Sequence, residues 1–259
     1  MENDKVKKVF RSRQSVLLIA FILSICKHLW VFAAVAVTVL LMASCATYND
    51  YETEGIPKFV AVNYIDLSQA DEHGQPLINR ISRFRSSEGH DYSDDFESAR
   101  SMKHYFDRTN SETEIYAPVN GTVLRIQKEN SEDIGRQIHI ASDRYPSFVF
   151  IIFHVKLIKD FVYGEKVKEG QILGHHTPSV NVRSSDIAVR VQTSKGMRLV
   201  SYFETLTPEA RKPYTDRRAD FMDKIIISEA ERDAHPLTLK GKDSFANAES
   251  DPLDTYVDF

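Results

Sequence analysis

The sequence has very little cysteine and no surplus of positive charge. Cys26 and Cys45 are its two cysteines, which are too few for a disulfide framework or a cysteine-built zinc cluster. The 33 Lys and Arg residues stand against 37 Asp and Glu residues, a formal net charge of −4. That balance gives no electrostatic case for binding nucleic acid. With 42% hydrophobic and 27% charged residues in 259, the composition is that of a globular protein and excludes wholesale disorder.

Long apolar runs are concentrated in the first 45 residues. Basic residues dominate positions 1–13, and two apolar stretches follow over 15–26 and 29–45, a pattern typical of a secretory signal. The stretch ends in Leu41–Cys45, which resembles a bacterial lipobox and implies cleavage before Cys45 and lipid attachment to it. The alternative is an uncleaved signal anchor. Both interpretations place residues 46–259 outside the cytoplasm, anchored to a membrane on the periplasmic face of the cell envelope.

After the predicted leader, the composition and the predicted secondary structure change along the chain. Residues 45–85 are expected to form a linker and N-terminal extension, and 86–112 read as a polar loop. Short β-type runs with turn signals between them predict strands over 115–126, 137–141, 148–156, 166–174 and 186–192. Asn120-Gly121 is one of these turn signals. The expected fold is therefore mainly β, with an antiparallel core over 86–205.

The last part of the chain, 206–259, has a different composition. Residues 208–233 have a moderate amphipathic helical pattern, with Phe221, Ile225 and Ile226 as its apolar positions. Residues 243–259 carry five acidic residues and no Lys or Arg. This tail is expected to be a solvated or mobile end.

Four short motifs follow one another in the β region: Ala117–Val123, Gly135–Ile140, Phe153–Val155 and Gly164–Gly174. Two families share the glycine motifs. The lipoyl and biotinyl carrier domains also need a Met-Lys pair at a hairpin tip, which this region lacks. In their order and spacing the four motifs resemble the M23 zinc metallopeptidases, the lysostaphin-like or LytM domains that cut peptide bridges in bacterial cell walls. The resemblance covers 86–205 and implies an M23-like β core.

The resemblance also implies a zinc site of two histidines and one carboxylate, with water as the nucleophile. The family's H-x-G-x-D motif is matched by Ser87–Asp91, with Asp91 kept and Ser87 in place of the histidine. Its H-x-H motif is matched by Asp186–Ala188, where Asp186 replaces a catalytic histidine and Ala188 replaces a ligand. The other catalytic histidine is kept as His154, which a satisfied core histidine would explain equally well.

One family ligand out of three does not hold zinc, so no cofactor is expected. A rebuilt zinc site from His90, Asp94 and either His175 or His176 is the alternative. The leading hypothesis is an envelope lipoprotein with a degenerate peptidase domain that binds peptidoglycan or regulates a cell-wall hydrolase. The other two are an active zinc endopeptidase with shifted ligands, and a lipid-anchored interaction module without wall contact.

Overall fold

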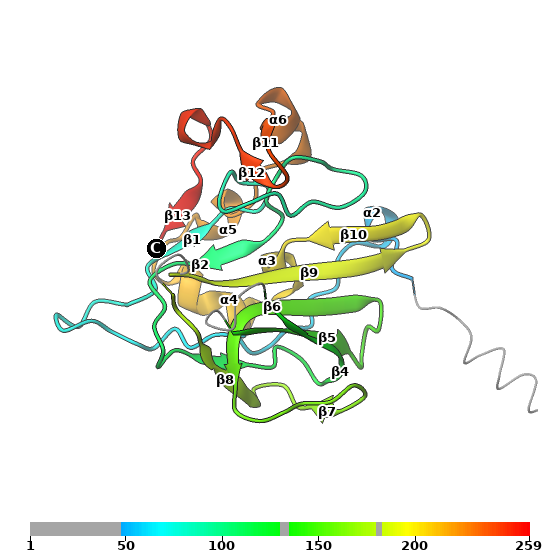
Figure 1. Ribbon diagram of the computed structural model, residues 1–259, viewed down its shortest axis with the longest axis vertical. Coiled ribbons are helices and arrows are strands. Elements are labelled where there is room, and N and C mark those ends of the chain that lie inside the picture. The colour runs from blue at the N-terminus through cyan, green and yellow to red at the C-terminus, as the bar shows by residue number, and fades with distance from the viewer. Residues whose placement is uncertain (1–47, 130–134, 180–182) are drawn as a thin grey trace, which may run out of the picture. The chain divides into compact units, whose positions relative to one another are not determined.

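The computed structural model describes residues 48–129, 135–179 and 183–259, which belong to one compact unit, Thr47–Phe259 (Figure 1). The expected leader, including Cys26 and the proposed lipid site Cys45, lies outside the described residues. Within them, no helix is long and apolar enough to cross a membrane. The expected boundaries at 85/86 and 205/206 both fall inside the compact unit.

Eleven strands of the described chain form one antiparallel sheet. Its main path is β13-β1-β2-β9-β6-β5-β4-β7, while β10 pairs with β9, and β8 pairs with both β3 and β6. The strands are β1 Arg80–Ser82, β2 His104–Phe106, β3 Glu114–Tyr116, β4 Gly121–Lys128, β5 Arg136–Ser142, β6 Phe148–Leu157, β7 Lys166–Val167, β8 Ile172–His176, β9 Ser185–Thr193, β10 Gly196–Val200 and β13 Tyr256–Asp258. A separate hairpin pairs β11 (Leu239–Lys240) with β12 (Ser244–Phe245). The expectation of a mainly β, antiparallel fold is confirmed.

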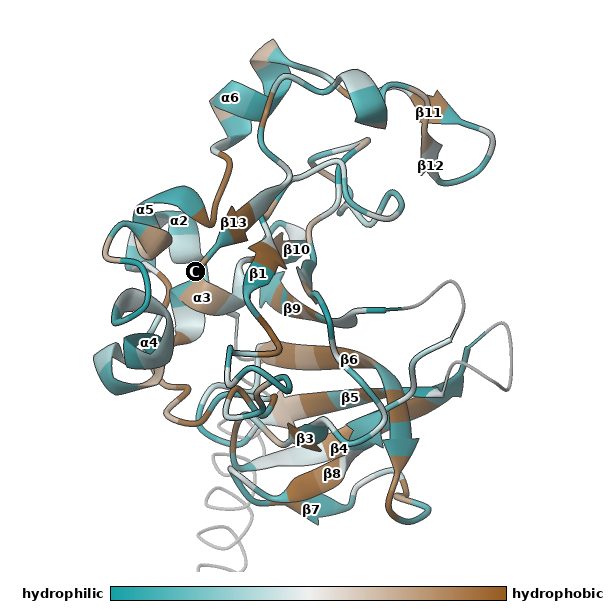
Figure 2. Ribbon diagram, turned by 90° about the vertical axis from the view of Figure 1, so that its left-hand side faces the viewer, coloured by the Kyte–Doolittle hydropathy of each residue, from teal (hydrophilic) through white to brown (hydrophobic). Residues whose placement is uncertain are grey.

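Alternation along the central strands produces two apolar layers. Phe148, Phe150 and Ile152 of β6 point into the larger cluster, whereas Val149, Ile151 and Phe153 point into a smaller one. Successive side chains of a strand face opposite sides of the sheet, so a strand covered on both faces reads as an unbroken apolar run. This explains why 148–156 is the clearest strand in the sequence, and Figure 2 shows its brown colour.

Helices cover the larger cluster. They are α3 (Tyr202–Thr205), α4 (Pro208–Thr215) and α5 (Phe221–Lys224), and Tyr51 of α2 (Tyr51–Glu54) also packs against it. The other helical elements are α6 (Glu229–Ala234) and a 3-10 turn, Ala248–Ser250. The predicted helical run 208–233 is thus broken. The helix is interrupted because the backbone here pairs with Phe84 in a short β-bridge. The Phe84 N–H donates to the Ile225 carbonyl, and the Ile227 N–H donates to the Phe84 carbonyl. Ser228 then caps a new helix by accepting from the Glu231 N–H.

The sequence predicts a solvated or mobile acidic tail, and four of its five acidic residues, Asp243, Glu249, Asp254 and Asp258, are exposed. Its last residues form β13, which pairs with β1 from Arg80↔Asp258 to Ser82↔Tyr256. Asp251 forms an ion pair with Arg232 at 2.9 Å, and both side chains are 1% exposed. One of the five acidic side chains of the tail therefore pairs with a buried arginine of the preceding helix.

Candidate functional site

A buried ion pair joins two neighbouring strands at the centre of the sheet. Lys103 directly precedes β2, and Asp186 lies near the start of β9. The antiparallel register pairs Tyr105 with Asp186 and His104 with Ile187, which brings the Lys103 side chain beside Asp186. The distance from Lys103 Nζ to Asp186 Oδ2 is 2.6 Å, and the side chains are 2% and 0% exposed.

His154 continues this pair into a row of four alternating charges. Its Nε2 lies 3.2 Å from Asp186 Oδ1, and its Nδ1 lies 2.5 Å from Glu129 Oε2. Burial alone lowers the pKa of His154, but the two carboxylates, Asp186 above all, outweigh it and raise the pKa to about 10. Burial likewise raises the pKa of Asp186, yet Lys103 and His154 hold it well below its usual range. The row is ammonium, carboxylate, imidazolium, carboxylate.

The backbone at His154 is strained in a way that aims its side chain. Its φ is 58°, a conformation that few residues other than glycine adopt. The Glu129 carboxylate accepts from the His154 N–H, and the His154 carbonyl accepts from the Thr177 N–H at 2.7 Å. Gly135 packs so closely that an added Cβ would lie 2.9 Å from the His154 carbonyl carbon. A tightly held bulge in β6 therefore presents the imidazole to Asp186.

Aromatic rings enclose the Lys103 ammonium. Nζ lies 4.2 Å from the ring centroid of Phe153, 4.8 Å from that of Tyr105 and 5.0 Å from that of Tyr92. A cation over an aromatic face is stabilised by the ring quadrupole, and more so where water is excluded. Three rings and one carboxylate thus hold the ammonium in a defined position.

This arrangement limits the chemistry of the site. Both ring nitrogens of His154 face carboxylates and carry protons at neutral pH, so the imidazole has no lone pair for a general base or a metal ligand. Asp186 is the only carboxylate in the H-x-H match, and it is already paired with the Lys103 ammonium. A divalent cation bound to Asp186 would be repelled by that ammonium. The residues present do not fit zinc.

Of the residues predicted for the site, Asp186 and His154 are brought together. Ala188 lies two residues further along the same face of β9, is 1% exposed and offers no metal-binding atom. His90 approaches the site, with its Nε2 3.4 Å from Lys103 Nζ. Burial, with a contribution from Lys103, lowers the pKa of His90, which favours the neutral ring there.

Three predicted residues, Ser87, Asp91 and Asp94, lie in the loop over 86–101 and form hydrogen bonds that hold it. The carboxylate of Asp91 accepts from the Ser93 hydroxyl and the Arg100 N–H. Asp94 accepts from the backbone N–H groups of Phe96, Glu97 and Leu199. The Ser87 hydroxyl lies 3.1 Å from the Thr255 hydroxyl.

The two adjacent histidines on β8 face different surroundings. His176 is buried, with its ring centroid 6.3 Å from that of His154, and burial lowers its pKa to about 4. His175 lines a surface hollow with Glu112 and Lys156. Across the described ranges, no three His, Cys, Asp or Glu side chains are placed together to hold a metal ion.

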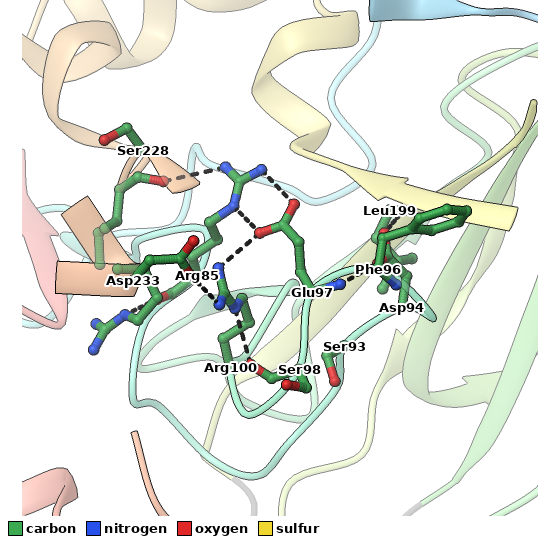
Figure 3. Close-up of polar contacts among 12 residues, drawn as sticks. Arg85, Ser93, Asp94, Phe96, Glu97, Ser98, Arg100, Leu199, Ser228 and Asp233 are labelled. Atoms are coloured by element: carbon green, nitrogen blue, oxygen red, sulfur yellow. Dashed lines mark hydrogen bonds and ion pairs between the residues drawn. The ribbon is translucent and has the colours of Figure 1, made fainter. Parts of the chain in front are cut away.

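A charge network holds the loop that carries His90 and Tyr92 (Figure 3). Glu97, 1% exposed, accepts from Arg85 at 2.5 and 2.7 Å and from Arg100 at 2.8 Å. Arg100 also reaches Asp233 of α6 at 2.6 Å. The loop is therefore tied to the C-terminal segment and keeps Tyr92 against the Lys103 ammonium.

Comparisons with protein-family models and with curated proteins find no match for this chain. Among solved structures, the fold is similar to the catalytic domain of a prophage-encoded M23 protein, EnpA, from Enterococcus faecalis, with 19% identity, a TM-score of 0.35, and coverage of 55% of this chain and 94% of that one. Csd3 of Helicobacter pylori matches with 14% identity, a TM-score of 0.39, and coverage of 68% and 41%. A zinc-containing peptidase of Vibrio cholerae matches with 17% identity, a TM-score of 0.31, and coverage of 50% and 41%. The chain spans less than half the length of the last two.

Lys103, Glu129 and the enclosing Tyr92 and Tyr105 were not predicted for the site. Lys103 lies 83 residues before Asp186, and no spacing rule connects them. The one local signal is that Lys103 interrupts an apolar and aromatic run, Met102–Phe106. A charge in such a run is usually paired when it is buried.

Proposed function

We propose that this chain is an exported cell-envelope protein whose β domain resembles the M23 peptidases but does not hydrolyse peptides. It binds peptidoglycan or regulates a wall hydrolase. The observation that carries the proposal is the Lys103–Asp186 pair, which puts a fixed ammonium on the residue that replaces a catalytic histidine of the family motif.

The electrostatics of the row support binding over catalysis. Hydrolysis by the family mechanism needs a metal to activate water and a histidine able to move a proton. In this chain the corresponding positions hold Asp186, which is paired with Lys103, His154, which is an imidazolium between two carboxylates, and Ala188. The charges of this row already neutralise one another and its side chains are buried, so the row offers no free reactive group.

The N-terminal sequence pattern supports the proposed export and membrane attachment. A basic start, apolar stretches and the lipobox-like Leu41–Cys45 favour export and attachment of a lipid to Cys45. The anchor keeps the β domain at the membrane, within reach of the wall or of a wall hydrolase.

Three measurements on the purified full chain test the proposal. Metal analysis is expected to find no stoichiometric zinc, wall peptides are expected to stay intact, and pelleting with peptidoglycan sacculi is expected to retain the protein. One tightly held zinc per chain together with cleavage overturns the proposal in favour of an active endopeptidase. Absence of sacculus binding and of any effect on a wall hydrolase overturns it in favour of an interaction module without wall contact.

A further inference from the structure

A tight turn between β6 and β7 exposes two adjacent apolar side chains. Val162 is 62% exposed and Tyr163 is 81% exposed. Among the residues that the structure describes, they are the two most exposed of the large apolar side chains, and the same loop carries a third, Ile158, at 54%. Single apolar residues scattered over a surface are normal, whereas neighbouring ones mark a contact surface.

The turn has a fixed shape and an ordered base. The Glu165 N–H donates to the Val162 carbonyl, and the Glu165 carboxylate accepts from the Val162 N–H. Gly164 has a φ of 82°, which glycine adopts freely, and its N–H donates to the Val123 carbonyl on β4. Phe161 is buried in the larger apolar cluster. The two exposed side chains at the apex are therefore presented without a large ordering cost on binding.

The turn offers apolar surface and little net charge. Residues 158–166 contain two Lys, one Asp and one Glu. Lys159 pairs with Glu165 at 2.5 Å, and Lys166 pairs with Asp143 at 2.7 Å. A partner that binds here is therefore held by burial of the apolar side chains more than by charge.

The turn lies at the end of the sheet where the described chain begins. The Asn49 N–H donates to the Gln192 carbonyl near the end of β9. The strand register places the end of β9, the start of β6, the end of β5 and the start of β4 at this same end. Val123, which binds the turn, is the third residue of β4. In Figure 1, α2 and β7 both lie towards the right-hand side.

The proposed lipid on Cys45 would hold this end of the sheet at a membrane. Cys45 precedes Asn49 by four residues, and four extended residues span at most about 14 Å. From β9 to β4 the sheet crosses three strand spacings, which is again about 14 Å. A lipid layer that accepts the anchor is therefore within reach of the turn.

We infer that the Val162–Tyr163 turn inserts into the membrane interface beside the lipid anchor. The inference rests on the proposed export and lipid attachment, and it adds a second membrane contact made by the β domain itself. Tyrosine is enriched at membrane–water interfaces, because its ring is apolar and its hydroxyl stays hydrated. A second contact fixes the orientation of the β domain, which a short tether alone leaves free to rotate.

The test places a single tryptophan either at the turn or at a distant exposed position. Trp30 is the only tryptophan of the chain, so Trp30→Phe/Tyr163→Trp and Trp30→Phe/Leu239→Trp each carry one reporter. Leu239 is also exposed, but it lies on the β11–β12 hairpin in the upper part of Figure 1, whereas β7 lies at the bottom. Both full chains are reconstituted into phosphatidylcholine vesicles, with or without bromine on the upper acyl carbons, and flotation of the vesicles checks attachment.

The tryptophan of Tyr163→Trp is expected to be quenched by the brominated lipid, with its emission shifted to shorter wavelength. Side chains bound at the interface lie about 5–10 Å deep, near the upper acyl carbons. The tryptophan of Leu239→Trp is expected to keep its intensity. Val162→Asp added to the Tyr163→Trp chain should abolish the quenching, because a carboxylate opposes insertion. Quenching should persist in high salt, since the turn has no net charge.

Other outcomes separate this inference from the proposed function. Flotation without quenching overturns the inference and leaves the anchor in place, whereas absence of flotation overturns the anchor and the inference with it. Equal quenching of the two reporters, or quenching lost in high salt, indicates unspecific adsorption and overturns the inference. An emission shift that needs an added wall hydrolase and no lipid assigns the turn to a protein partner and also overturns it. Quenching without sacculus binding supports the membrane contact and overturns wall binding.

Discussion

Lys103 Nζ lies 2.6 Å from Asp186 Oδ2, and both side chains are buried among strands β2, β6 and β9. The pair brings a permanent cation to a position where the M23 resemblance predicts catalytic chemistry. A protein-bound ammonium supplies positive charge but cannot exchange ligands or activate water as a metal does.

Removing the ammonium should strongly destabilise the fold. Lys103→Met leaves the Asp186 carboxylate buried with one partner fewer, and such a loss costs about 3–5 kcal/mol of unfolding free energy. Urea unfolding measures it, with Lys212→Met on the exposed face of α4 as the control, where a change within about 0.5 kcal/mol is expected. Lys103→Met/Asp186→Leu should recover part of the loss. A cost below about 1 kcal/mol for Lys103→Met would show that the pair is not formed.

Stability should peak near neutral pH and fall on both sides. The folded pKa of His154 is about 10 against an ordinary value of 6.5, so its contribution is complete below 6.5 and is lost as the pH rises towards 10. His104, His139 and His176 have folded pKa values of about 4, with burial as the largest cause. The unfolded chain then binds more protons between pH 4 and 6.5, and stability falls as the pH falls through that range.

Unfolding free energies measured from pH 5 to pH 10 test this profile. His154→Gln is the matched variant, because it removes the contribution of His154 to the alkaline slope and leaves the contributions of His104 and His139 to the acid slope. An identical slope between pH 7 and 10 in the variant and the unaltered chain would contradict the assignment.

Glu97 should control the mobility of the loop over 86–101. Glu97→Gln weakens the bonds to Arg85 and Arg100, and we expect local opening to become easier by about 2 kcal/mol, roughly thirtyfold in amide exchange. Hydrogen exchange read by mass spectrometry should report this for peptides containing His90 and Tyr92. Asp220→Asn breaks an exposed pair with Arg218 and should leave that loop unchanged. Equal exchange in both variants would mean that the network does not hold the loop.

His90→Ala and Asp94→Ala should differ in stability but not in metal content. Asp94 accepts three backbone N–H groups, so its removal should cost about 1–3 kcal/mol of unfolding free energy. His90→Ala should cost about 1 kcal/mol, since its ring is half-buried. Thermal unfolding and metal analysis of both variants check this. Loss of bound zinc in either variant would instead support the rebuilt metal site.

Much of the fold was predictable from local pattern. Strands β4, β5, β6 and β9 fall where alternation and β-type composition predict them. Alternation with a period of two involves only consecutive residues, so it can be recognised in the sequence alone. The short strands β1, β2 and β13 were not predicted. Each has three residues, which are too few for a periodic signal. Each forms because its backbone hydrogen-bonds to a neighbouring strand.

The site was predictable only in part. His154 and Asp186 follow from the order of the motifs, and the structure brings them within 3.2 Å. The Ser87–Asp91 match depends on a short polar segment, and the structure uses Asp91 and Asp94 to hold the loop by accepting backbone N–H groups. Short polar side chains often bind nearby backbone in this way, so a motif read there carries little information about metal binding.

The sequence by itself determined that the long apolar runs are concentrated in the first 45 residues. It also determined that the core is built from alternating strands and that cysteine cannot hold a metal. Tertiary structure decided which charges meet. Lys103 reaches Asp186 because β2 and β9 are neighbours in the sheet, and the acidic tail is ordered because β13 pairs with β1. The strength of an ion pair depends on separation and burial, and both are properties of strands that the fold brings together from distant parts of the chain.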